Sequence, residues 1–155
     1  KSADEHIKDA VINSCNWWYY VNGLNAAWRP DVTVVHPVKS TSNIAAYADI
    51  VKAKFDAQTG VENQMEVLMQ QKYIHLNIST AYELFAELRR TRHPLLDPFV
   101  FNGVVMKPMP ERIKYPTSEL QTNQEEFLKV SSENNYTTPI FWVPADKISV
   151  SYYSN

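Results

Sequence analysis

Apolar residues recur every three or four positions as far as Pro94, and this spacing predicts amphipathic helices. Four helices follow from the pattern, with capping residues and helix-stopping residues at their ends. Their expected bounds are Ser2 or Asp4 to about Asn22, Ser42 or Asn43 to Thr59-Gly60, Val61 to Leu76, and Ser79 or Thr80 to Pro94. The side chains expected to face a core are Ile7, Val11, Ser14 and Trp18, then Ile44, Tyr47, Ala48, Val51 and Phe55, then Met65, Leu68, Met69, Tyr73 and Leu76, and finally Ala81, Tyr82, Phe85 and Leu88.

The remaining segments predict loops and short strands. Residues 25–41 are predicted to be a loop, in which VTVV (residues 32–35) forms a short extended piece. After Pro94, further prolines divide the chain, and we expect a strand at Phe99–Met106, one or two short helices in 118–130, and a terminal strand at 148–153. The predicted fold class is mainly α, with helical-repeat-like helices followed by an irregular proline-rich C-terminal segment with short strands. No break in composition marks a second domain, so we expect residues 1–155 to be a single domain or a fragment.

Composition narrows the classes of function. A formal net charge of -2 gives no general attraction to nucleic acid. No apolar run approaches the roughly 18 residues of a membrane-spanning helix. The single cysteine, Cys15, excludes an internal disulfide. The residues before it are too polar for a lipid-attachment site, so we expect Cys15 to be a buried thiol on a helix. The start at Lys1 fits a mature or trimmed product, a fragment of a longer chain, or the removal of a tag.

No arrangement of residues predicts catalysis. The four histidines are His6, His36, His75 and His93. They do not pair at the spacing of metal ligands on a helix, so we expect no metal and no cofactor, and His75 is expected to be packed or hydrogen-bonded. Glu83 and Glu87 would suit an acid–base pair. The favoured interpretation is a solvated face on which Glu87 pairs with Arg90 at i+3.

Aromatic residues are the candidate ligand contacts. Trp17, Trp18, Tyr19 and Tyr20 are consecutive on the first predicted helix, so their side chains point in nearly all directions. Flat aromatic faces stack on sugar rings, and Trp and Tyr also hydrogen-bond. Core packing is the favoured alternative for this run, whereas both roles stay open for Trp28 in the expected loop. The candidate ligand-binding residues are Trp28, Arg29, Trp17 and Tyr20.

Arg89 and Arg90 close the fourth predicted helix, where positive charge suits the helix C-terminus. A structural clamp onto the segment that follows is the default interpretation. Anion binding through bidentate guanidinium contacts is the alternative.

Two stretches carry a resemblance to a known family. They are QKYIHLNISTAYELFAELRRTRHP (residues 71–94) and MPERIKYPTSELQTNQEEF (residues 109–127). In this order they resemble the C-terminal part of SusD-like (SusD/RagB) proteins of the Bacteroidetes outer membrane. The residues that match the family pattern are Gln71, Lys72, Tyr73, Arg89, Arg90, Pro94, Arg112, Tyr115, Pro116, Glu119 and Asn123.

The resemblance implies a cell-surface lipoprotein of the outer membrane that captures an oligosaccharide or other nutrient without catalysis. It implies a SusC-like TonB-dependent transporter as partner, and the missing N-terminal part of the same protein as a second partner. The motif residues are implied to lock the last helices to the irregular segment rather than to touch ligand. The chain departs from the family in being short, in lacking the lipidated N-terminal cysteine, and in the continuation of its tail after Trp142.

Two other functions stay open at this point. One is a helical-repeat scaffold for protein–protein interaction without a small-molecule ligand. The other is a hydrolase whose catalytic groups are scattered along the sequence. We expect the protein not to be an enzyme.

Overall fold

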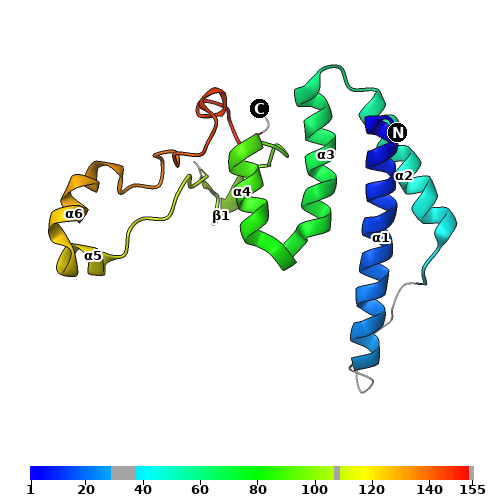
Figure 1. The fold of residues 1–155 in the computed structure, drawn as a ribbon, viewed down its shortest axis with the longest axis horizontal. Helices are drawn as coiled ribbons and strands as arrows, with labels where there is room; N and C mark the ends of the chain where they lie inside the picture. Colours follow the sequence, from blue (N-terminus) through cyan, green and yellow to red (C-terminus); the bar gives the residue numbers. More distant parts are fainter. Residues whose placement is uncertain (29–37, 107–108, 154–155) are drawn as a thin grey trace. The chain divides into compact units, whose positions relative to one another are not determined.

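A computed structural model of the protein describes residues 1–28, 38–106 and 109–153. It contains two compact units, residues 1–77 and residues 78–155, which are described separately and are called the N-terminal and C-terminal units (Figure 1). The described residues form six α-helices and a two-stranded sheet, which confirms the predicted mainly α fold. The single domain stays a prediction.

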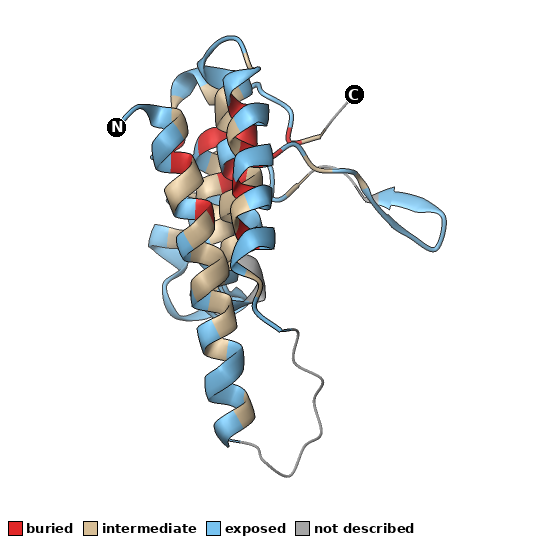
Figure 2. Ribbon diagram, turned by 90° about the vertical axis from the view of Figure 1, so that its right-hand side faces the viewer, coloured by how far each residue is buried: buried red, intermediate tan, exposed pale blue. Residues whose placement is uncertain are grey.

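Three helices make up the N-terminal unit: α1 (Ala3–Trp28), α2 (Thr41–Asp56) and α3 (Val61–Leu76). Helix α1 packs on both α2 and α3, and α2 packs on α3. Buried residues lie on the sides of the helices that face one another (Figure 2). The core of this unit consists of Ile7, Val11, Ala48, Val51, Phe55 and Val67, with Ile12 and Cys15 partly buried against it.

The helix ends differ from the prediction in two places. Helix α1 continues six residues beyond Asn22, so the expected stop at Asn22-Gly23 is wrong, as is the expected loop from residue 25 to residue 28. Leu24, Ala26 and Ala27 favour helix, and their propensity outweighs the single unfavourable Gly23. Helix α2 begins at Thr41 rather than behind Ser42 or Asn43, because Ser40 Oγ accepts a hydrogen bond from the Asn43 backbone N–H at 3.2 Å. Residues 32–35, predicted as an extended piece, lie outside the described residues.

The core-facing side of α3 is only partly the predicted one. Met69 is buried as expected, but Leu68 and Tyr73 are exposed, and the most buried residue is Val67, which the pattern did not select. Apolar side chains occur all around this helix, so periodicity alone does not choose its buried face. Tyr47 on α2 is also more exposed than expected, whereas Ile44, Ala48, Val51 and Phe55 are buried as predicted.

An ion pair joins α1 to α2. The Lys52 ammonium contacts the Asp4 carboxylate and, at 2.8 Å, the Asp56 carboxylate. The hydrogen bond from Lys52 holds the pKa of Asp4 at about 2, and the pKa of Lys52 is raised by the same contact.

Acid is therefore expected to weaken this link between α1 and α2. The pKa of Asp4 is lower in the folded protein than the ordinary 3.8, so the stabilisation is complete above that value and is lost as the pH falls to about 2. A carbon-13 NMR titration of the Asp4 carboxyl would show a midpoint near 2 in the native protein. The variant Lys52→Met should raise that midpoint towards the ordinary value, because the hydrogen bond from Lys52 is the largest cause of the shift. A native midpoint near the ordinary value would contradict the prediction.

The C-terminal unit begins with helix α4 (Ala81–Thr91), which follows the 3₁₀ helix η1 (Asn77–Thr80). Only Leu88 of its predicted core face is buried. Phe85 is half-buried, Ala81 is exposed, and Tyr82 is 89% exposed. The helix ends at Thr91, before the predicted stop at Pro94, because Arg92 adopts a left-handed conformation with φ of 62° and its N–H bonds to the Leu88 carbonyl at 2.8 Å.

Short elements follow α4. Strands β1 (Phe99–Phe101) and β2 (Val104–Met106) form an antiparallel hairpin, so the single strand predicted over this range is wrong. Asn102 and Gly103 both have positive φ angles, as a tight hairpin turn requires. Helices α5 (Thr117–Thr122) and α6 (Gln124–Lys129) confirm the two short helices. The remaining elements are the 3₁₀ helices η2 (Ser131–Glu133) and η3 (Ala145–Lys147).

The predicted terminal strand is wrong. Residues 148–153 contain only one isolated bridge, which pairs Tyr153 with Leu96 in parallel. The adjacent Leu96 N–H bonds to the Tyr152 carbonyl at 2.9 Å. Both contacts tie the end of the chain to the segment that follows α4.

Candidate functional site

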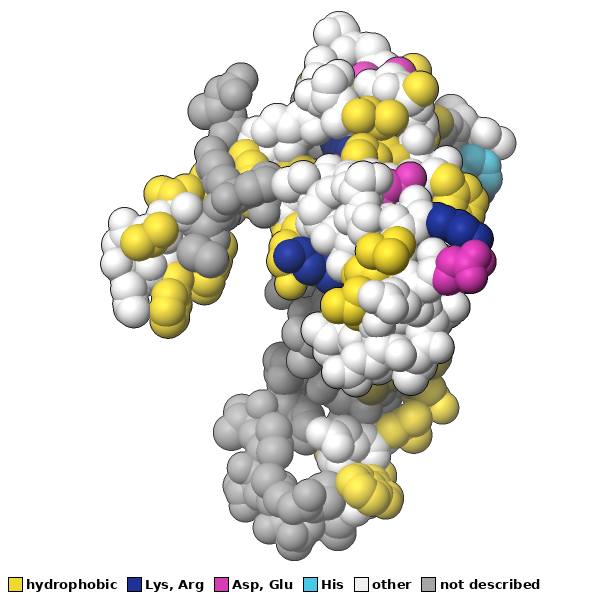
Figure 3. Space-filling view, turned by 90° about the vertical axis from the view of Figure 1, so that its left-hand side faces the viewer, with side chains coloured by type: hydrophobic (Ala, Val, Ile, Leu, Met, Phe, Trp, Pro, Cys, Tyr) yellow, Lys and Arg dark blue, Asp and Glu magenta, His cyan; other side chains and the backbone are white. Residues whose placement is uncertain are grey.

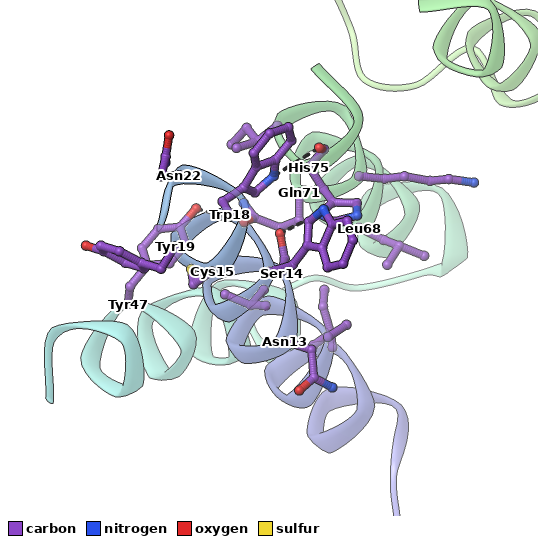
Figure 4. Close-up of a pocket in the computed structure, with 16 residues that line it drawn as sticks. Asn13, Ser14, Cys15, Trp18, Tyr19, Asn22, Tyr47, Leu68, Gln71 and His75 are labelled. Atoms are coloured by element: carbon purple, nitrogen blue, oxygen red, sulfur yellow. Dashed lines mark hydrogen bonds between the residues drawn. The ribbon is translucent and has the colours of Figure 1, made fainter. Parts of the chain in front are cut away.

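A groove of about 740 Å³ opens in the N-terminal unit. Its walls come from α1 and α3, and Tyr47 of α2 closes one side (Figure 4). Two core residues, Ile7 and Val11, reach its surface, and Trp17, Trp18 and Tyr19 line it from α1. This volume is in the range of small-molecule sites.

Hydrogen bonds between helices shape the groove. Ser14 Oγ lies 2.7 Å from His75 Nδ1, and the Trp18 indole N–H donates to the His75 carbonyl at 3.1 Å (Figure 4). The Tyr47 hydroxyl donates to Gln71 Oε1 at 2.7 Å, which connects α2 to α3. These bonds confirm that His75 is packed and hydrogen-bonded, and they fix the spacing of the groove walls. Gln71, one of the family-pattern residues, is therefore part of the groove wall.

The four consecutive aromatic residues 17–20 of α1 differ in their exposure. Trp18 and Tyr19 are half-buried, and the Trp18 ring meets the His75 ring edge to face at 6.2 Å. Trp17 is 52% exposed and lies 5.9 Å from the Tyr20 ring, which is also exposed. None of the four belongs to the buried core of this unit, and Trp17 is the candidate ligand residue that lines the groove.

Three of the four candidate ligand residues lie on one stripe of α1. Trp17, Tyr20 and Trp28 recur with Leu24 at intervals of three and four residues, and all four side chains are exposed. Trp28 is 78% exposed and lies in the helix rather than in a loop. Arg29 lies outside the described residues.

Several groove residues were not predicted to be ligand contacts. Asn13, Ser14 and Asn22 of α1 face this space, as do Lys72 and His75 of α3. Their convergence depends on contacts between residues about sixty positions apart, and no local pattern encodes such contacts. Lys72 and Tyr73 belong to the matching motif, and Tyr73 is exposed on α3.

The arginines at the end of α4 have different surroundings. Arg89 donates from Nη1 to the Glu111 carbonyl at 2.8 Å, and its guanidinium lies over the Trp142 ring at 4.7 Å. Burial lowers the pKa of Arg89 from its usual value. Arg90 instead bonds to Glu87 on its own helix at 2.7 Å, as predicted for an i+3 pair. Of these two arginines, only Arg89 contacts the tail among the described residues.

Arg92, a third arginine, was missed and is fully buried. Its Nε donates to the Lys147 carbonyl at 2.8 Å, and its Nη1 lies 2.9 Å from Glu111 Oε1. The guanidinium stacks on the Tyr152 ring at 4.0 Å. No signal in the sequence marked it, because its burial depends on Glu111, Lys147 and Tyr152, which lie far along the chain.

The downstream motif residues contact one another in the irregular segment. Arg112 lies 3.2 Å from the Tyr115 hydroxyl and 3.5 Å from the Glu133 carboxylate. The Tyr115 ring meets the Phe127 ring edge to face, and its backbone N–H donates to Asn134. The three other motif residues are Pro116, which precedes α5, and Glu119 and Asn123, whose side chains hydrogen-bond at 3.3 Å. Pro94, upstream, is buried. These contacts support an internal structural role for the motif.

Two further properties concern only the described residues. Within residues 1–28, 38–106 and 109–153, no three His, Cys, Asp or Glu side chains gather as metal ligands would. None of the helices described is both long enough and apolar enough to cross a membrane.

Comparison with known proteins identifies a family. A family model described as SusD-like, Susd and RagB outer membrane lipoprotein, matches residues 4–143. No curated protein and no solved structure matches the chain.

Proposed function

The chain belongs to the SusD-like family of outer membrane lipoproteins, and we propose that it is a non-catalytic nutrient-binding component acting at the cell surface. In this proposal it captures an oligosaccharide or other nutrient for a SusC-like TonB-dependent transporter. The N-terminal part of the same protein would complete the assembly.

The groove between α1 and α3 is the observation that carries the proposal. Trp17, Trp18 and Tyr19 present aromatic surface to a space of about 740 Å³. Aromatic faces bind the C–H faces of sugar rings, and the amides of Asn13 and Asn22 along the same groove offer donors and acceptors for hydroxyl groups. Because the wall residues Ser14, Gln71 and His75 are already hydrogen-bonded within the protein, the groove is preformed.

A second candidate function is supported by the exposed stripe on α1. A helix that presents large apolar residues at intervals of three and four residues suits packing against a partner helix. The stripe of Trp17, Tyr20, Leu24 and Trp28 has this spacing, and residues 14–28 carry no charge. Hydrophobic side chains also reach the surface in several patches on the face of the molecule seen in Figure 3. A helical-repeat scaffold without a small-molecule ligand would use such surfaces.

Replacing Trp17 with alanine is expected to weaken glycan binding about fivefold or more, since a stacked aromatic ring contributes roughly 1 kcal/mol or more. Titration calorimetry against a glycan panel measures the affinity, and affinity electrophoresis provides a second readout. Tyr82→Ala is the matched control, because Tyr82 is an exposed aromatic residue of the C-terminal unit. Equal losses in both variants would refute the groove as the site. Binding of a partner helix with no glycan binding would favour the scaffold, and release of cleaved product would overturn the non-catalytic assignment.

A further inference from the structure

Two of the three glycines of the chain, Gly23 and Gly103, directly follow an asparagine. In an Asn-Gly pair the glycine backbone nitrogen can attack the carbonyl carbon of the asparagine side chain, because glycine has no β-carbon to obstruct the approach. The reacting atoms belong to neighbouring residues, so no cofactor and no second protein is needed to bring them together. The fold therefore decides which of the two pairs reacts, through the availability of the glycine nitrogen.

The first pair, Asn22 and Gly23, lies inside helix α1. Beyond the first turn of an α-helix each backbone N–H donates to the carbonyl four residues earlier, which for Gly23 is the carbonyl of Tyr19. The glycine nitrogen is thus engaged, and reaction at this pair requires the helix to open locally. Asn22 itself is exposed, so its protection comes from the helical backbone and not from burial.

The second pair, Asn102 and Gly103, forms the turn of the β1–β2 hairpin. Phe101 and Val104 pair directly across this two-residue turn, so the hydrogen bonds that close the turn belong to them, and the Gly103 N–H lies outside the ladder. Asn102 and Gly103 are both exposed. Among the described residues, no atom beyond the chain neighbours of Gly103 lies within 4 Å of the position that a β-carbon would occupy there.

The hairpin that holds this turn is short and uncovered. Three residue pairs join its strands. The side chains of residues 99–101, 104 and 105 are each more than half exposed. A two-stranded hairpin without a packed face is marginally stable in water, so this turn opens far more often than the middle of a helix and lets the Asn102 side chain reach the Gly103 nitrogen.

We propose that Asn102 is a site of spontaneous deamidation and that the fold protects Asn22 from the same reaction. The Gly103 nitrogen gives its proton to solvent hydroxide and bonds to Cγ of Asn102, and the side-chain amide nitrogen takes up a proton and leaves as ammonia. Water then opens the resulting succinimide at either carbonyl and leaves aspartate or isoaspartate at this position. Nothing is oxidised or reduced. The product places a negative charge in residues 98–106, which carry none, and isoaspartate also lengthens the turn backbone by one methylene.

Peptide mapping by mass spectrometry tests the proposal on the full chain after incubation in mildly alkaline buffer. Proteolysis is carried out in weakly acidic buffer, in which the glycine nitrogen keeps its proton. Deamidation is expected at Asn102, and at Asn22 it should be slower by about tenfold or more, because the hydrogen bond of the Gly23 N–H and the helix around it must first be broken. In the chain unfolded by urea the two Asn-Gly pairs should react at similar rates.

The variant Asn102→Gln identifies the reacting residue. It should abolish the product in the hairpin and leave the slow conversion of Asn22 unchanged. Equal rates at Asn22 and Asn102 in the folded protein would overturn the proposal, because the fold would then protect neither pair. Absence of product at Asn102 in the folded protein would also overturn it, whatever the unfolded chain does. None of these readouts depends on glycan binding in the groove.

Discussion

Arg92→Ala is expected to destabilise the C-terminal unit by about 3–5 kcal/mol, the cost of leaving one member of a buried ion pair without its partner. Arg92 is 0% exposed, and its guanidinium contacts the Glu111 carboxylate, the Lys147 carbonyl and the Tyr152 ring. Its loss would leave the buried Glu111 carboxylate without its ion-pair partner. It would also remove the side-chain contacts that Arg92 makes with the end of the chain.

Hydrogen exchange in a urea series, followed on peptides from residues 78–155, measures this loss. Arg90→Ala is the matched control, because Arg90 is exposed and pairs with Glu87 in a surface contact worth less than about 1 kcal/mol. The double variant Arg92→Met with Glu111→Leu should recover most of the stability, since apolar side chains of similar volume commonly replace a buried ion pair without loss. Similar values for Arg92→Ala and Arg90→Ala would show that Arg92 does not hold the tail.

Local signals in the sequence were sufficient to predict most of the helices. Helix α3 has its predicted bounds, Val61 and Leu76. The residues directly before Val61 and directly after Leu76 interrupt a helical pattern, so the sequence itself marks both ends of the helix. The buried face of α2 was predicted at four of five positions, since Tyr47 alone is exposed. Where a helix carries apolar side chains on all of its sides, as α3 does, the neighbouring helices determine which side is buried. Val67 was missed for that reason.

The candidate sites were less predictable because their residues come together through long-range contacts. The aromatic run at Trp17 drew attention to one groove wall, but no pattern connects Ser14 with His75. The arginines at the end of the fourth predicted helix correctly indicated a contact with the tail. It identified Arg89 and Arg90, whereas the buried anchor is Arg92, whose role depends on Glu111 and Tyr152. Burial of a charged residue is set by the partners that the fold supplies, and a single sequence does not display them.

Phe55→Ala should destabilise the N-terminal unit by about 3–5 kcal/mol, as is typical when a buried aromatic side chain is removed from a core. Phe55 is 9% exposed and packs in the cluster that includes Val11 and Val67, so it joins α2 to both other helices of this unit. The cavity left by the ring would not close easily, because the surrounding side chains belong to three different helices.

Ile50→Ala provides the comparison on the same helix. Ile50 is 66% exposed, and surface substitutions of this kind usually change stability by less than about 1 kcal/mol. Urea denaturation followed by hydrogen exchange in residues 1–77 would measure both variants. Because Val11 belongs to the core and also lines the groove, loss of the core would open the groove floor as well. Phe55→Ala should therefore weaken glycan binding together with stability, whereas Trp17→Ala should weaken binding alone. An unchanged stability in Phe55→Ala would mean that α2 does not contribute to this core.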